Sequence, residues 1–168
     1  MKYLLLAAVL ATAACSSPAE PTSTTQPLAN TFESPEGLAR GVLDALGARD
    51  LQRLNSLALS EAEFKTHVWP ELPVSLPERN VPFDYAWGQM KQRSDGSLQS
   101  TIGRYAGRKL IFVRTRFTGE TTKYASFEVM RESEITASDE NGRDLVLRLY
   151  GSAMLKDGRY KLYSYVVD

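Results

Sequence analysis

The spacing of the apolar residues changes once along this chain, and that change constrains the fold more than any other feature. Before Gly107 apolar side chains recur every three or four residues, whereas after it they alternate with polar ones. The first spacing gives a helix one apolar stripe, and the second gives a strand one apolar face. Helices followed by strands predict an α+β domain in which the helices pack on an antiparallel sheet.

Capping residues and prolines divide the helical half. Ser34 followed by Pro35 is typical of a helix start, and this first helix is expected to end near Gly47. Asp50 is expected to cap a second helix, and Ser60 with Glu63 forms the capping box of a short third one.

A proline-rich connection and a fourth helix follow. Residues 69–80, WPELPVSLPERN, contain three prolines, which argues against regular structure there. Pro82 can open the fourth helix, and we expect a turn at Ser94-Asp95-Gly96 to interrupt it before Gly107.

Four strands linked by hairpins are expected after Gly107. In the first strand Ile111 and Val113 are predicted on the apolar face, and a bulge is expected in the second before Ile135. Asn141-Gly142 is typical of a hairpin turn, and so is Asp157-Gly158. The strands are expected at residues 111–117, 125–137, 145–149 and 160–166.

This order of elements resembles the NTF2-like (cystatin-like) superfamily. The resemblance rests on the first helix with the turn Ala48-Arg49-Asp50-Leu51, and on the final strand after Lys156-Asp157-Gly158. It implies helices packed on a curved four-stranded antiparallel sheet, a cone whose wide end can hold a small ligand, and dimers formed through the sheet. The proline-rich run and the helix near Leu98 enlarge the middle of the usual pattern, so pocket positions are not carried over by register.

The first 33 residues precede this domain. Residues 1–14 have the basic start and apolar run of an export signal. Thr12-Ala13-Ala14-Cys15 resembles the lipobox of bacterial lipoproteins, with Thr12 in place of the usual Leu, which implies a lipid attached to Cys15. Ordinary cleavage near the alanines is the alternative.

The expected mature chain begins with a tether. Residues 15–33, the lipidated Cys15 and a stretch rich in Ser, Thr and Pro, are expected to be disordered, and residues 34–168 to form the globular domain. In lipoproteins a residue other than Asp after the cysteine implies release to the outer membrane, and Ser16 fits. The expected location is therefore the bacterial cell envelope, at the outer membrane facing the periplasm.

Several function classes lack their signatures. Lys and Arg number 20 and so do Asp and Glu, which argues against nucleic acid as a partner. One histidine and one cysteine do not supply a metal site, and no cofactor motif is present. Without a catalytic motif, no residue is assigned as catalytic.

Weak acid–base candidates remain near the proline-rich connection. His67, Asp84 and Tyr85 could place a titratable group in the cone, as proton transfer requires. His67 lies off the stripe formed by Phe64 and Val68, which favours a position on the surface.

Aromatic side chains are the candidates for ligand or partner binding. Trp87 is at helical spacing with neighbouring apolar residues, which favours the core, whereas Trp69 before Pro70 is the better surface candidate. Core packing is an equal alternative for the aromatic residues of the last strand. The full set is Trp69, Tyr85, Trp87, Tyr163 and Tyr165.

A basic cluster marks the start of the strand half. It comprises Arg104, Arg108, Lys109, Arg114 and Arg116. It could receive an anionic partner, but pairing across strands with Glu128, Glu132 and Glu134 is the simpler interpretation.

The sequence therefore predicts a lipid-anchored envelope protein whose non-catalytic NTF2-like domain binds a small ligand or a protein partner. The alternative is an enzyme of the isomerase or dehydratase kind that uses His67 or Asp84. A homodimer formed through the sheet is a further expectation.

Overall fold

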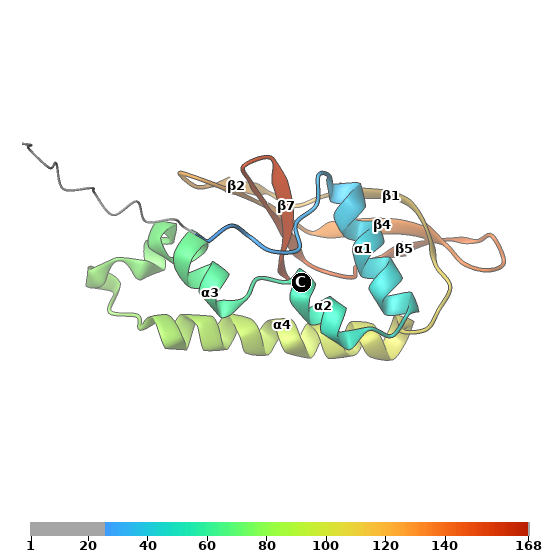
Figure 1. Ribbon diagram of the computed structural model, residues 1–168, viewed down its shortest axis with the longest axis horizontal. Helices are drawn as coiled ribbons and strands as arrows, with labels where there is room; N and C mark the ends of the chain where they lie inside the picture. Colours follow the sequence, from blue (N-terminus) through green and yellow to red (C-terminus); the bar gives the residue numbers. More distant parts are fainter. Residues whose placement is uncertain (1–25, 168) are drawn as a thin grey trace, which may run out of the picture.

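The structure, a computed structural model, describes residues 26–167 and has its helices before its strands. The expected signal peptide, Cys15 and residues 16–25 of the expected tether lie outside the described residues. The α+β class is confirmed (Figure 1). The helices are α1 (Pro35–Gly47), α2 (Leu51–Leu57), α3 (Glu61–Glu63) and α4 (Phe83–Tyr105).

Each of the first three helices begins at the predicted cap. The Ser34 hydroxyl accepts a hydrogen bond from the Gly37 amide at 3.0 Å, and the Asp50 carboxylate accepts one from the Arg53 amide at 2.8 Å. Ser60 and Glu63 form the expected reciprocal capping box. These contacts satisfy amides that the first turn of a helix leaves without partners.

The proline-rich connection contains more regular structure than expected. α3 continues as a π-helix over Phe64–Val68. Three short 3-10 turns follow, at Trp69–Glu71, Pro73–Ser75 and Pro77–Arg79, each with a proline in its first two positions. Proline is tolerated there because the first amides of a helix have no intrahelical partner.

The expected turn inside the fourth helix is absent, and α4 runs without a break over 23 residues. It extends along the length of the molecule in Figure 1. Ser94 is buried, and its hydroxyl accepts a hydrogen bond from the Tyr165 amide at 3.0 Å. A Cβ added to Gly96 would have no atom from another part of the chain within 4 Å. Glycine in a helix costs only about 1 kcal/mol relative to alanine. Gly96 alone therefore does not end a helix that the hydrogen bond of Ser94 holds against the domain.

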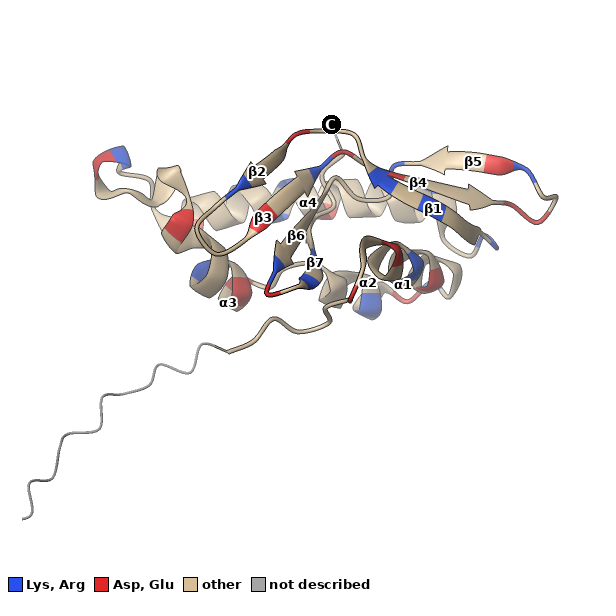
Figure 2. Cartoon of the chain, turned by 90° about the horizontal axis from the view of Figure 1, so that it is seen from above, with Lys and Arg blue, Asp and Glu red and all other residues tan. Residues whose placement is uncertain are grey.

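The strands form two antiparallel sheets instead of the single curved four-stranded sheet that was expected. One sheet has the order β1-β4-β5 and the other β2-β3-β6-β7. The order of pairing is still that of a meander, because the second expected strand divides into β3 and β4, while β2 and β6, outside the expected ranges, continue β1 and β5 into the other sheet (Figure 2). The strands are β1 (Ile111–Phe117), β2 (Thr121–Lys123), β3 (Glu128–Arg131), β4 (Ser133–Ser138), β5 (Asp144–Leu147), β6 (Ser152–Lys156) and β7 (Arg159–Ser164).

Local backbone conformations divide the strands. Glu132 alone separates β3 from β4, and its φ of 54° lies in the left-handed region that strands do not use. Gly151 lies between β5 and β6, where an added Cβ would be 1.5 Å from the carbonyl oxygen of Val166. The bulge expected before Ile135 is therefore present as a break at Glu132. The segment after β7 passes close to the other break, at Gly151.

The prediction for the first strand is wrong at its start. A register shift between Phe112 and Arg114 turns the earlier residues over. Ile111 and Val113 are 56% and 46% exposed, whereas Phe112 packs against the core.

Two clusters of apolar side chains form the interior. The larger one joins α1 and α2 to the sheets, and α1 contributes six buried residues to it. The smaller one lies around Phe64 and Val68, near Val129 and Met154 of the four-stranded sheet. Within residues 26–167 no helix is long and apolar enough to cross a bilayer.

Residues 28–33, which we call the N-terminal strap, lie on the folded domain. The Phe32 amide donates to the Tyr160 carbonyl at 2.9 Å, and the Tyr160 amide donates back at 2.8 Å. The ring of Phe32 covers Gly41 so closely that an added Cβ would lie 2.7 Å from it. Ordered structure therefore begins before Ser34, the expected start of the domain.

A buried lysine holds the strap. Lys161 on β7 is 1% exposed, and its ammonium donates to the carbonyls of Ala29 at 2.8 Å and Ser56 at 3.2 Å. Its charge is balanced by Glu63, with 3.5 Å between Nζ and Oε2. The Glu63 carboxylate in turn accepts from the Ala29 amide at 2.8 Å. Both polar groups of the Ala29 backbone are thus bound to one buried ion pair.

Candidate functional site

A groove between α4 and the end of β7 gathers three of the aromatic residues singled out from the sequence, namely Trp87, Tyr163 and Tyr165. Its volume is about 410 Å³, within the range typical of small-ligand pockets. We call it the aromatic groove. Its lining residues are Asn55, Ala58, Leu59, Ser60, Glu61, Trp87, Met90, Lys91, Ser94, Asp95, Tyr163 and Tyr165.

Helical spacing brings one side of α4 to the groove. Trp87, Met90 and Ser94 lie three and four residues apart and share one face of the helix. Lys91 and Asp95 pair with each other on the exposed rim. The walls are therefore aromatic and apolar, and the charges lie at the opening.

The two tyrosines play different parts in the groove. Tyr165 is buried in the larger core, and its hydroxyl donates to the Leu54 carbonyl at 2.6 Å. Burial raises its pKa above the usual value and raises the pKa of Tyr163 to about 12. Both phenols are uncharged at neutral pH, which suits an apolar or aromatic ligand. Core packing, the alternative left open from the sequence, describes Tyr165.

The position of His67 off the stripe suggested a surface residue, but the side chain is buried and only 8% exposed. Its Nε2 lies 2.8 Å from the carbonyl oxygen of Gln26. His67 follows Phe64 by three residues, which places the two side chains on neighbouring parts of one helix surface, and the contact with Gln26 covers the ring. As a result Phe64, His67 and Val68 all face inward.

Asp84 and Tyr85 do not line the pocket that His67 lines. That pocket, about 570 Å³ in volume, includes Lys156 and Arg159 as well as Glu71 and Asp157. Asp84 and Tyr85 are exposed in the first turn of α4, and Tyr85 is 62% exposed. The three acid–base candidates therefore do not converge on one pocket.

A polar network beside His67 escaped the sequence analysis. Lys156 Nζ donates to the Ser126 hydroxyl at 2.7 Å, and that hydroxyl donates to Glu71. Burial alone would raise the pKa of Glu71, but hydrogen bonds from Ser126 and the charge of Lys156 outweigh it and hold the pKa below its usual value. An ionised carboxylate of lowered pKa is a weak base, so this network joins three segments and does not activate the serine. No local pattern marks it, since the residues are far apart in sequence.

Trp69 packs within the smaller core cluster and not in the aromatic groove. Its ring meets that of Phe83 edge to face, with centroids 5.6 Å apart. Phe64 contacts both rings, with its centroid 6.4 Å from that of Trp69 and 6.1 Å from that of Phe83. Trp69 is partly buried and serves packing at this end of the domain.

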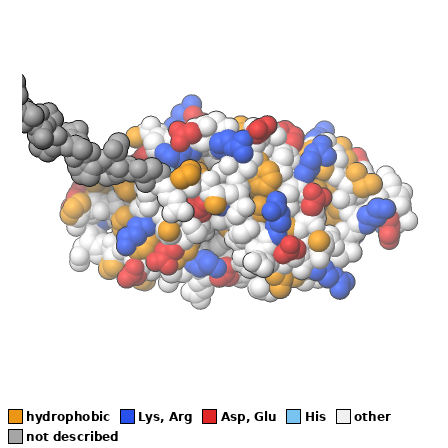
Figure 3. Space-filling model, in the orientation of Figure 1, with side chains coloured by type: hydrophobic (Ala, Val, Ile, Leu, Met, Phe, Trp, Pro, Cys, Tyr) orange, Lys and Arg blue, Asp and Glu red, His pale blue; other side chains and the backbone are white. Residues whose placement is uncertain are grey.

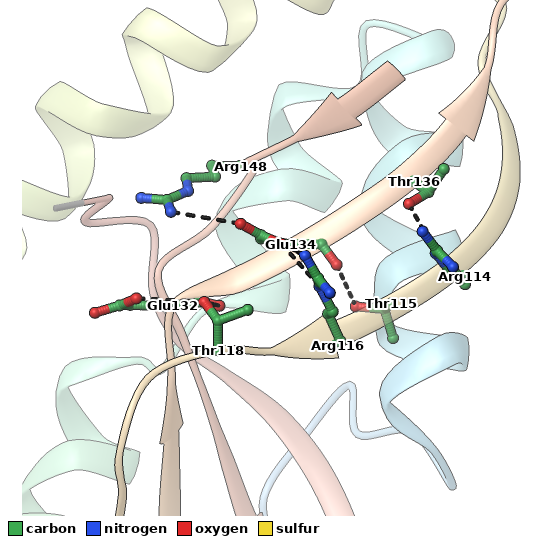
Figure 4. Close-up of polar contacts among 8 residues, drawn as sticks. All are labelled: Arg114, Thr115, Arg116, Thr118, Glu132, Glu134, Thr136 and Arg148. Atoms are coloured by element: carbon green, nitrogen blue, oxygen red, sulfur yellow. Dashed lines mark hydrogen bonds and ion pairs between the residues drawn. The ribbon is translucent and has the colours of Figure 1, made fainter. Parts of the chain in front are cut away.

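The basic cluster of the first strand pairs across the sheet in part. Arg116 lies 2.6 Å and Arg148 3.5 Å from the Glu134 carboxylate, and Arg114 donates to the Thr136 hydroxyl at 3.2 Å (Figure 4). Hydrogen bonds from Arg116 hold the pKa of Glu134 below its usual value. Cross-strand pairing is thus confirmed for Glu134.

The other expected acidic partners have different contacts. Glu128 pairs with Lys123 at 3.0 Å, outside the basic cluster. Glu132 accepts a hydrogen bond from the Thr118 hydroxyl at 3.3 Å. On the face shown in Figure 3, basic and acidic side chains are interspersed.

In residues 26–167 no group of three or more His, Cys, Asp or Glu side chains could hold a metal ion. Comparisons of the chain with protein-family models, with curated proteins and with solved structures find no match. The geometry of the described residues therefore carries the functional argument.

Proposed function

We propose that this chain is a lipid-anchored protein of the bacterial envelope whose domain binds a small ligand in the aromatic groove. The observation that carries the proposal is the convergence of Trp87, Met90 and Tyr163 on a groove of about 410 Å³. Aromatic and apolar walls with few polar groups, and with the charged Lys91 and Asp95 at the exposed rim, are typical of sites for apolar or aromatic ligands.

An NTF2-like fold is part of the same proposal. Helices that precede an antiparallel meander, and the division of that meander into two sheets, are its support. A bend of this kind gives a sheet two differently directed parts, as the curved wall of a cone requires.

The enzyme alternative has less support. Within residues 26–167 the His67 ring is hydrogen-bonded to the backbone carbonyl of Gln26, and Asp84 does not line the same pocket. If the isomerase or dehydratase hypothesis is right, His67→Ala combined with Asp84→Asn should reproduce the phenotype of a deletion. We expect the double variant to behave as the wild type does.

The anchor is proposed from Cys15 and its neighbours. Mass spectrometry of the mature N-terminus tests it directly: an acylated Cys15 is expected, and an unmodified mature start would refute it. A homodimer through the outer side of the three-stranded sheet also remains a prediction, supported by the exposed side chains of Ile111, Val113 and Val146. Sedimentation of the purified chain tests it.

Binding in the groove is tested with indole, a neutral aromatic probe, in a ligand-observed NMR titration of the full chain. Trp87→Ala should weaken indole binding by at least about fivefold, because truncation of an aromatic residue at the centre of a binding site costs more than about 1 kcal/mol. Tyr85→Ala is the matched control, since Tyr85 lies on the same helix but does not line the groove. Equal loss in both variants, or in neither, would contradict the proposal.

A further inference from the structure

The charges that line the aromatic groove do not balance. The lining contains one basic residue, Lys91, and two acidic residues, Glu61 and Asp95. Lys91 and Asp95 lie four residues apart on α4, and the ammonium is 2.5 Å from each carboxylate oxygen. Because these two charges neutralise each other, the carboxylate of Glu61 is the charge left over in the groove.

The cations around the start of α3 have other partners. Lys65 lies four residues after Glu61, and its ammonium stands over the ring of Phe83, 5.0 Å from the centroid. Lys161 of β7 pairs with Glu63. Among the residues that the structure describes, Glu61 forms no ion pair. Its negative charge is therefore available to a ligand.

Contacts of α3 place Glu61 beside the α4 wall of the groove. Glu61 precedes Phe64 by three residues, which puts the two side chains on neighbouring parts of one helix surface. The ring of Phe64 packs against that of Trp87, with centroids 5.4 Å apart. Glu61 is thus about one helical turn away from a ring that touches Trp87.

A second contact joins the same segment to the β7 wall of the groove. The Leu59 amide donates to the Leu162 carbonyl at 3.0 Å. Tyr163 follows Leu162 along β7, and Glu61 follows Leu59 by two residues. Both walls of the groove are therefore connected to the segment that carries Glu61, through contacts made within three residues of it.

The aromatic walls suit a cation as well as an apolar group. The faces of aromatic rings attract an ammonium group that lies within about 6 Å, and the indole ring of Trp attracts it most strongly. Trp87 supplies an indole ring and Tyr163 a phenol. Burial raises the pKa of Tyr163 to about 12, so this phenol is uncharged at neutral pH. Ring faces with one exposed carboxylate beside them favour a cation over a neutral molecule of the same shape.

We propose that the ligand of the aromatic groove is an organic ammonium cation, with its apolar body against Trp87 and Tyr163 and its ammonium group beside Glu61. The ammonium site rests on the proposed function, since it names the class of ligand for the same groove. An ammonium group donates charge-assisted hydrogen bonds to a carboxylate, and these are stronger than hydrogen bonds between neutral groups.

Two residues report on the groove alone. A second pocket, of about 300 Å³, shares Met90 and Tyr163 with the groove. Its charged lining residues are Arg93, Arg131, Glu132 and Arg148. Glu61 and Trp87 do not line this second pocket, so their variants distinguish binding in the groove from binding next to it.

The test compares three probes that share an indole ring and differ in charge, in ligand-observed NMR titrations of the full chain at pH 7 and low salt. Tryptamine is a cation, indole is neutral and indole-3-propionate is an anion. We expect tryptamine to bind at least about threefold more tightly than indole, because an exposed ion pair and a cation on an aromatic face each add a modest stabilisation. Indole-3-propionate should bind more weakly than indole. Equal affinities for tryptamine and indole, or tighter binding of the anion than of the cation, would overturn the proposal.

Variants of Glu61 locate the ammonium group. Glu61→Gln should bring the affinity for tryptamine close to that for indole, and Glu61→Lys should reverse the order of tryptamine and indole-3-propionate. Glu78→Gln is the matched control, because Glu78 is exposed on a 3-10 turn and does not line the groove. Equal weakening of tryptamine binding in Glu61→Gln and Glu78→Gln would indicate a general effect of charge and would refute the site.

The same titrations separate the ammonium ligand from the proposed function. Indole binding that Trp87→Ala weakens, without any preference for tryptamine, would refute the ammonium ligand alone. If none of the three probes binds, or if Trp87→Ala weakens none of them, the aromatic groove is refuted as a binding site and the ammonium ligand with it.

Discussion

Replacing the buried lysine of β7 tests how the N-terminal strap is held. In Lys161→Met the side chain keeps its approximate length but loses two charged hydrogen bonds, to the carbonyls of Ala29 and Ser56, and its ion pair with Glu63. Removing one partner of a buried ion pair typically costs about 3–5 kcal/mol. The desolvation that lowers the pKa of Lys161 is relieved at the same time, so we expect a loss of about 3 kcal/mol.

Urea unfolding followed by circular dichroism measures this loss. With a slope of about 2 kcal/mol per molar urea, the midpoint should fall by roughly 1.5 M. Lys109→Met is the matched control, because Lys109 is exposed and its replacement should stay within about 0.5 kcal/mol. Amide exchange should also accelerate at Phe32 and Tyr160, which join the strap to β7. A loss below about 1 kcal/mol with unchanged exchange would refute the reasoning.

Three further predictions concern stability. Burial alone would raise the pKa of Glu63, but hydrogen bonds from the Ser60 and Ala29 amides and the charge of Lys161 hold this pKa below its usual value of 4.5. Because the pKa is lower in the folded state, the ionised carboxylate stabilises the fold above pH 4.5, and this stabilisation is lost as the pH falls through the folded pKa. Glu63→Gln should therefore flatten acid unfolding curves below about pH 4.5. Gly151→Ala should lower the thermal midpoint strongly, because its Cβ would overlap the Val166 carbonyl oxygen; a change within the error of calorimetry would contradict that close approach. Ser94→Ala should cost about 1–3 kcal/mol in chemical unfolding, since it leaves the Tyr165 amide without its acceptor, whereas the exposed Ser100→Ala should cost little.

The sequence predicted what local chemistry decides. Ser34, Asp50 and Ser60 cap their helices because each hydroxyl or carboxylate acts within its own first turn. The meander order followed from turns whose residues favour a positive φ, such as Gly142 and Gly158.

Contacts between distant segments decided the rest. The turn predicted at Ser94-Asp95-Gly96 is absent because Ser94 binds the Tyr165 amide, 71 residues away. The register of β1 depends on a bulge that no residue type demands, so Ile111 and Val113 were assigned to the wrong face. His67 was placed outside because its contact with the Gln26 carbonyl, 41 residues away, does not follow from the spacing of apolar residues.

The aromatic groove was predictable in part. Trp87 and Tyr163 were candidates as aromatic residues, but helical spacing favoured the core for Trp87, and no pattern shows that the two side chains meet. The pocket lined by Arg93, Arg131 and Arg148 was not predictable, because these residues come from separate segments that meet only where the sheets divide.

The strap also changes what the four-stranded sheet offers to other chains. Phe32 and Leu59 form backbone hydrogen bonds along the outer edge of β7, and the Leu59 amide donates to the Leu162 carbonyl at 3.0 Å. At the opposite margin of that sheet stands β2, which is only three residues long. Open strand edges invite pairing with extended segments of other molecules, and covered or very short edges resist it. Residues just ahead of the first helix therefore act as a guard against edge-to-edge aggregation, and a chain cut after Glu33 should be more prone to it.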